Sequence, residues 1–124
     1  VTAGFVALAI ALETMRQSGA LVRPPLLDQV AAVSVGHLDE GLALDLVYKE
    51  DSAPRVDMNV VATAQGAIVE VQATAEGEAV PRSDIDRMID LALAGITSHA
   101  AVQRRAIEQA GVDLPRLFQE GRAP

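Results

Sequence analysis

The sequence of 124 residues has no cysteine and no tryptophan, and its only aromatic residues are one tyrosine and two phenylalanines. Without cysteine the chain forms neither a disulfide nor a thiolate metal site, which suits a reducing compartment, and we expect a cytoplasmic protein. With so few aromatic side chains, the core has to be aliphatic. No apolar run approaches the roughly 20 residues of a membrane-spanning helix, and the apolar start lacks the basic leader of a signal peptide.

Basic residues are also scarce, with ten Lys and Arg against seventeen Asp and Glu and a net charge of −7. Nucleic-acid-binding proteins normally present a basic face, because neutralising phosphates drives their affinity. This chain alone is therefore a poor surface for RNA. Its length leaves room for one domain with a modest core.

The hydrophobic pattern predicts helices at both ends of the chain with strands between them. The apolar start should form a helix that is buried nearly all round and stops near Gly19. Strands are expected at 28–35, at 42–48 and, as a hairpin around Gly66, at 58–63 and 68–74. A long helix then begins with Ser83 as its N-cap and Asp86 at the reciprocal position, and it ends at Gly111. The pattern indicates an α+β fold, in which a mainly antiparallel four-stranded sheet packs against two long helices.

Two histidines are weak candidates for function. His37 is expected in a turn over residues 36–41, and His99 is expected in the middle of the long helix. Neither has a cysteine or a second histidine nearby in the sequence, so both are interpreted as exposed side chains rather than as a base or a ligand. Arg104 and Arg105 are interpreted as a solvated helix end, with contact to RNA phosphates as the alternative.

Two aspartates stand out where strands and a turn meet. Asp51 lies in a turn with Ser52 and Pro54, and Asp57 follows six residues later at the start of a strand. Two such carboxylates can share a hard divalent cation, since Mg²⁺ takes oxygen ligands and keeps several waters. The alternative is that Asp51 makes a local turn and Asp57 caps a strand edge, as solvated acids commonly do.

Three stretches in this order resemble ribonuclease PH, a phosphate-dependent 3′ exoribonuclease family that trims transfer RNA precursors. They are DLVYKEDS at 45–52, DMNVV at 57–61 and VEVQATAEG at 69–77. With less detail the similarity continues to about Ile107, and Ala73 departs from the family, which usually has glycine there. The resemblance implies that Asp51 and Asp57 are the paired active-site aspartates, which hold Mg²⁺ or Mn²⁺ and assist phosphorolysis.

The resemblance also implies what else the activity requires. In the family, the first helix directly follows a Thr-Arg stretch that binds inorganic phosphate, the co-substrate. Residues 1–124 are therefore expected to be the C-terminal half of a ribonuclease PH-like domain, without the phosphate-binding half. The implied partners are the tRNA 3′ end, the missing half and identical subunits in a hexameric ring of dimers, without a membrane. The fragment alone is expected to be inactive.

Two other functions remain open at this point. The chain is alternatively a non-catalytic structural ring subunit of an exosome-like assembly, or a folded module without activity. Retention of both Asp51 and Asp57 favours the enzyme, because a purely structural subunit has no need of the pair.

Overall fold

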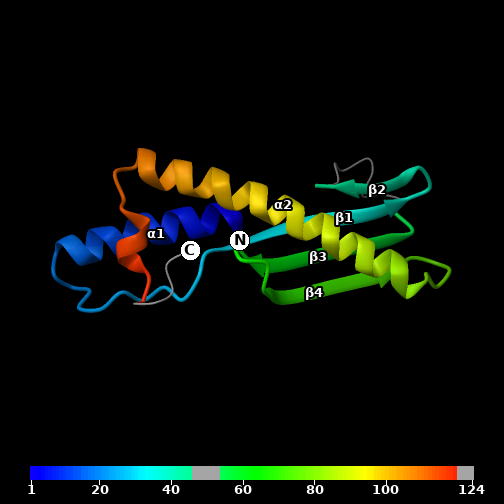
Figure 1. Ribbon diagram of the computed structural model, residues 1–124, viewed down its shortest axis with the longest axis horizontal. Coiled ribbons are helices and arrows are strands. Elements are labelled where there is room, and N and C mark those ends of the chain that lie inside the picture. Colours follow the sequence, from blue (N-terminus) through cyan, green and yellow to red (C-terminus); the bar gives the residue numbers. More distant parts are fainter. Residues whose placement is uncertain (46–53, 120–124) are drawn as a thin grey trace.

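The computed structural model describes residues 1–45 and 54–119. In chain order the elements are α1 (Thr2–Gln17), β1 (Val30–Leu38), β2 (Gly41–Leu44), β3 (Val56–Thr63), β4 (Ile68–Ala75), α2 (Arg82–Gln109) and the 3₁₀ turn η1 (Leu114–Leu117) (Figure 1). The strands form one sheet in the order β2-β1-β3-β4, and each neighbouring pair is antiparallel. The predicted α+β class, with an antiparallel four-stranded sheet and two long helices, is confirmed.

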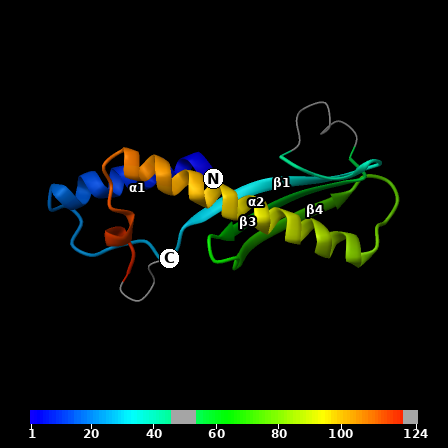
Figure 2. The same cartoon turned by 45° about the horizontal axis from the view of Figure 1, so that its top comes forward.

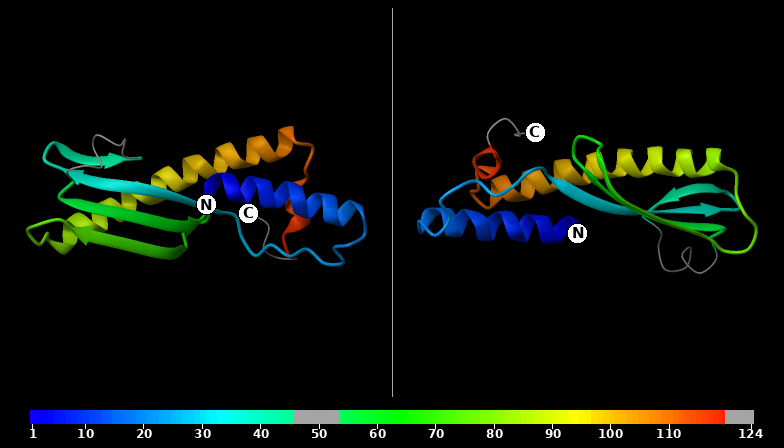
Figure 3. Two further views of the ribbon diagram at one scale, coloured as in Figure 1. Left: turned by 180° about the vertical axis from the view of Figure 1, so that it is seen from behind. Right: turned by 90° about the horizontal axis from the view of Figure 1, so that it is seen from below.

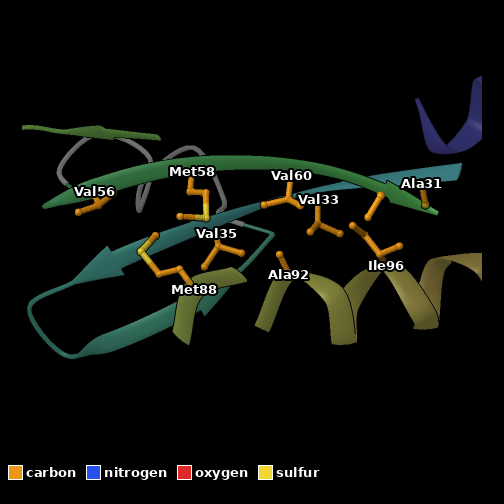
Figure 4. Packing of buried hydrophobic residues seen from close by; sticks show 10 residues of the cluster. Ala31, Val33, Val35, Val56, Met58, Val60, Met88, Ala92 and Ile96 are labelled. Carbon is orange, nitrogen blue, oxygen red and sulfur yellow. The ribbon is translucent and has the colours of Figure 1, made fainter. Parts of the chain in front are cut away.

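One face of the sheet packs against α2. In β1 and β3, alternate side chains are buried, as expected for strands with one covered face. Figure 4 shows these side chains meeting Met88, Ala92 and Ile96 of α2. The resulting first cluster contains only aliphatic residues and methionine: Ala31, Val33, Val35, Val56, Met58, Val60, Ala62, Met88, Ala92 and Ile96.

The position of α1 differs from the expectation of a helix that is buried nearly all round. The helix lies beyond the end of the sheet, beside the C-terminal part of α2, which crosses the sheet and continues past it (Figures 1 and 2). Only Phe5, Ala9 and Glu13 of α1 are buried, whereas Leu8 and Met15 are 48% and 44% exposed. A second cluster forms there: Phe5, Ala9, Leu26, Ile107, Val112, Leu114, Leu117 and Phe118.

The first hairpin is tighter than the sequence pattern predicted. β1 continues to Leu38, and His37 pairs with Leu42 on one side and with Val56 on the other. The turn is therefore limited to the two residues after Leu38, and the placement of His37 in a turn was wrong. Pairing with both neighbouring strands explains the difference, because it holds the backbone of Gly36 and His37 extended. The second predicted turn is confirmed, with Gly66 at φ 87°.

The start of α2 differs from the prediction, whereas its end agrees with it. The helix begins at Arg82 after Pro81 without a side-chain cap, so the assignment of Ser83 as the N-cap was wrong. Asp86 instead lies 3.5 Å from the Arg82 guanidinium, one turn away. Gly111 has φ 78°, the left-handed conformation that commonly follows a helix end. Neither described helix has the length and apolar content to cross a membrane.

Two buried glutamines join α1, β1 and α2. Gln29 and Gln103 are 0% and 1% exposed, and the Gln29 amide donates to Gln103 Oε1 at 2.7 Å and to the Ala100 carbonyl at 2.8 Å. The Gln103 amide donates in turn to the carbonyls of Thr2 at 2.8 Å and Val30 at 3.0 Å. Buried polar groups are tolerated only when they are hydrogen-bonded, so these bonds fix the helix, the strand and the second helix in one arrangement.

Arg104 extends this network rather than ending the helix in solvent. Its Nη1 donates to Gln29 Oε1 at 3.0 Å, so the guanidinium completes the hydrogen bonding of the buried amide. Arg104 is half-buried and Arg105 is exposed, and neither lies in the last turn of α2. The interpretation as a solvated side chain therefore fits Arg105 and was wrong for Arg104, and neither arginine is placed to complement the last turn of the helix.

We predict that Gln103→Leu destabilises the chain by roughly 2–4 kcal/mol, because the carbonyls of Thr2 and Val30 then lose a buried donor. The free energy of unfolding from urea titration measures this change. Gln109→Leu, the same replacement at an exposed position of the same helix, should stay within about 0.5 kcal/mol of the parent. Equal effects of the two replacements would contradict a structural role for the buried amides.

Glu13 is the buried acid of α1. Its carboxylate accepts hydrogen bonds from Arg16 Nε at 2.7 Å, from Arg16 Nη2 at 2.8 Å and from Gln17 Nε2 at 2.9 Å. These bonds, those of Arg16 first, lower the pKa of Glu13 from its ordinary 4.5 to about 2. Hydrogen bonds to the charged form favour ionisation, so the folded chain binds this proton less tightly than the unfolded chain does.

It follows that ionised Glu13 stabilises the fold above pH 4.5 and that this stabilisation is lost as the pH falls towards 2. We predict that Glu13→Gln is less stable than the parent at pH 7 and that the difference shrinks steadily between pH 4.5 and pH 2. Urea unfolding of both proteins at pH 7, 4.5 and 3 measures the difference. A gap that is the same at all three values would refute the assignment.

Candidate functional site

The face of the sheet opposite α2 carries polar side chains. Figure 3 shows α2 on one side of the sheet only, and no described helix covers the other side. Along β3 the buried side chains alternate with Asp57, Asn59 and Val61, which point to the opposite face because successive side chains of a strand alternate. We call this surface the open face.

Strand register places Asp57 within a row of the open face. Asp57 is half-buried and pairs with Gly36 of β1 and Thr74 of β4. Directly paired residues share a face of the sheet, with Cβ atoms about 4.5–5.5 Å apart. The side chains of Thr74 and Asp57 are therefore neighbours on the open face.

The next row of the open face is neutral and polar. Asn59 pairs with Ser34 of β1 and Gln72 of β4, and both amide side chains are exposed. In the row after that, Val61 pairs with Glu70, whose carboxylate accepts a hydrogen bond from Gln72 Nε2. We call the pair Asn59 and Gln72 the amide row. On β3 and β4 it lies between Asp57 and Glu70, the two described acids of the open face.

Asp51 lies outside the described residues, so its pairing with Asp57 stays a prediction. The described residues on either side of that part of the chain are attached to β1. The Asp45 N–H donates to the Ser34 carbonyl at 2.9 Å, and the Arg55 N–H donates to the His37 carbonyl at 2.7 Å. The chain therefore leaves the sheet after β2 and rejoins it before β3, the two strands that flank β1.

Sequence reasoning missed a contact between β2 and α2. His99 Nε2 lies 3.3 Å from Asp45 Oδ2, so His99 is not the freely solvated side chain that was expected. One turn earlier in α2, Gly95 makes room for Leu44, because a Cβ at Gly95 would lie 2.7 Å from a Leu44 methyl carbon. The pair at Asp45 comes from residues 54 positions apart in the sequence, and no local pattern announces it. His37 is half-buried, and it was also expected to be exposed.

The donor atoms of the open face suit a hard cation. Within residues 1–45 and 54–119, no three of His, Cys, Asp and Glu gather into a metal cluster. Asp57 nevertheless offers a carboxylate, and Thr74 offers a neutral oxygen in the same row. Oxygen atoms are the ligands that Mg²⁺ prefers, and Mg²⁺ commonly uses only one or two carboxylates from the protein. The residues present therefore fit such an ion.

Comparison with known proteins gives the family. The model of the 3′ exoribonuclease family, domain 2, matches residues 28–95. Ribonuclease PH of Nocardia farcinica is 49% identical over 108 residues, which cover 86% of this chain and 42% of that protein. Ribonuclease PH of Mycobacterium avium is 45% identical over 125 aligned positions, covering 100% of this chain and 47% of that protein. The chain therefore belongs to the 3′ exoribonuclease family, and within it to ribonuclease PH, of which it corresponds to the C-terminal half.

A solved structure supports the fold independently of close sequence similarity. The crystal structure of rice (Oryza sativa) Rrp46 matches with a TM-score of 0.58 at 17% identity, over 68% of this chain and 39% of that one. At this identity the match concerns the fold alone. The chain spans about half the length of the curated relatives it matches.

Proposed function

We propose that this chain forms the acidic side of the active site of a phosphorolytic exoribonuclease. The enzyme removes nucleotides from the 3′ ends of tRNA precursors in the 3′-to-5′ direction and releases nucleoside diphosphates. The family match over residues 28–95, with Asp57 on the open polar face inside that match, is the observation that carries the proposal.

In this reaction an oxygen of inorganic phosphate attacks the phosphorus that joins the last nucleotide to the RNA. The bond from that phosphorus to the 3′ oxygen of the preceding nucleotide breaks, and the 3′ oxygen takes up a proton. Asp57 and Asp51 would hold Mg²⁺ or Mn²⁺ through their carboxylates. When bound, the cation supplies positive charge for the scissile phosphate or the leaving oxygen. The pairing of β3 with a strand on each side keeps the backbone at Asp57 fixed, so this carboxylate is preorganised.

Charge indicates how the site is divided. The chain carries −7, and Asp57 and Glu70 add negative potential to the open face itself. Phosphate and the RNA backbone need arginine, lysine or backbone donors. We therefore assign inorganic phosphate and most RNA phosphates to the N-terminal half of the complete enzyme, and the metal to residues 1–124.

Exposed apolar side chains fit a chain that works within a larger assembly. Leu8 and Met15 of α1 are about half exposed, as are Ile68 and Val69 of the edge strand β4. Exposed apolar patches and unpaired strand edges commonly mark interaction sites. We propose that these surfaces meet the N-terminal half and identical subunits, in a hexameric ring of dimers located in the cytoplasm.

We predict that, in the complete enzyme, Asp51→Asn or Asp57→Asn lowers turnover on the order of 10²–10³-fold while the thermal melt is nearly unchanged. Asparagine keeps the size of the side chain but lacks the negative charge that a hard cation needs. If the two acids share one metal, the double mutant should be little worse than either single mutant. Phosphate-dependent release of nucleoside diphosphates is the measurement.

Glu70→Gln is the matched control, since it removes a carboxylate from the same face, two rows from Asp57, and should keep most of the turnover. A folded Asp57→Asn enzyme with ordinary turnover would end the catalytic assignment. It would support instead the alternative in which these acids only form a turn and a strand edge.

We also predict that residues 1–124 alone release no nucleoside diphosphate from RNA, because the phosphate-binding residues are elsewhere. Adding the N-terminal half of the Mycobacterium avium relative as a separate polypeptide should restore some phosphate-dependent turnover. The same mixture with the Asp57→Asn chain is the control and should stay inactive. Full trimming activity of this chain alone would overturn the division of the site.

A further inference from the structure

The open face contains a second feature besides its acids, the amide row formed by Asn59 and Gln72. Both side chains are exposed, although the neighbours of Asn59 along β3, Met58 and Val60, are 0% exposed. Asn59 therefore cannot turn towards the core. Its pairing with Gln72 places the two amides next to each other, one row from Asp57.

The chemistry of this row limits what it can bind. Glu70 on the far side of the row from Asp57 repels a phosphate, and neither amide carries a positive charge to attract one. An amide both donates and accepts hydrogen bonds, which suits neutral hydroxyl groups. The Gln72 amide nitrogen already donates to Glu70, so its Oε1 remains as an acceptor. The amide nitrogen of Asn59 can donate hydrogen bonds next to that acceptor. A sugar hydroxyl both donates and accepts hydrogen bonds, so it can use the two amides together.

Spacing connects this row to the reaction. Positions two apart on a strand are separated by about 6.5–7 Å, which is about the distance from a nucleotide's 5′ phosphorus to the hydroxyls of its own ribose. If the scissile phosphate lies at Asp57, the ribose of the 3′-terminal nucleotide reaches the amide row.

We infer that Asn59 and Gln72 contact the ribose hydroxyls of the 3′-terminal nucleotide and select ends that carry a 2′-OH. The inference rests on the proposed function, because it takes the position of the scissile phosphate from Asp57. The 2′-OH is the group by which proteins distinguish RNA from DNA at a given position. The amide row would thus decide which ends enter the site, while the acids act in the reaction.

The test compares two oligonucleotides that differ by one oxygen atom. One is a single-stranded RNA, and the other is the same RNA with a 2′-deoxy 3′-terminal nucleotide. Their binding to the complete enzyme is measured by fluorescence anisotropy in Mg²⁺ without phosphate, so that no phosphorolysis occurs. We expect the parent to bind the ribose end about three- to tenfold more tightly, the value of one or two neutral hydrogen bonds. Asn59→Ala and Gln72→Ala should each reduce this ratio, and the double mutant should bring it close to one.

Gln65→Ala is the matched control, because Gln65 is an exposed amide in the β3–β4 turn, outside the row, and its loss should leave the ratio unchanged. Equal binding of the two oligonucleotides to the parent, or an unchanged ratio in the folded double mutant, would overturn the inference. Adding phosphate to the parent tests the proposed function separately, through the release of nucleoside diphosphate. An enzyme that prefers the ribose end but releases no nucleoside diphosphate would contradict the proposed function. The amide row would then still be a sugar-binding site.

Discussion

The hydrogen-bonded pair Gln29–Gln103 holds the two parts of this molecule together. The core under the sheet and the second cluster around α1 contain different residues, and the two amides join α1, the start of β1 and α2. A buried amide without partners is costly and its hydrogen bonds are directional, whereas hydrophobic burial is non-directional. The amides therefore specify one position of α1 relative to β1, and apolar packing alone would leave that position loosely defined.

The same strand alternation builds both the core and the candidate site. Met58 is buried against α2, and its neighbours Asp57 and Asn59 point to the open face. A shift of one residue in register would bury Asp57 and expose Met58, because the side-chain period of a strand is two. The burial of the aliphatic core therefore selects the register that presents the acid and the amides. Stability and the arrangement of the site are two results of one pattern.

Local pattern predicted the elements and the open-face acid well, since the strand period around Asp57 is visible in the sequence itself. It did not predict the Gln29–Gln103 and Asp45–His99 contacts, which join residues far apart in the chain and have no local signal. It misjudged α1, because the apolar composition of a helix does not tell how much of its surface the rest of the chain covers. The N-cap at Ser83 failed because Pro81 already sets the backbone at the helix start. The turn at Asp51 was predicted from Ser52 and Pro54 and its active-site role from the family resemblance, and Asp51 lies outside the described residues.

The attachment of α1 has a consequence for synthesis of the chain. The Gln103 amide donates a hydrogen bond to the Thr2 carbonyl, and these two residues are 101 positions apart in the chain. The β3–β4 hairpin, in contrast, closes over only four residues. Short loops close at a lower entropy cost than long ones, so the hairpin can form long before α1 docks. At about 5–20 residues per second, α1 waits about 5–20 s on the ribosome before its partner is made. During that interval Phe5 and Ala9 lack most of their native cover, so the apolar face of α1 stays exposed until the end of α2 and η1 have been made.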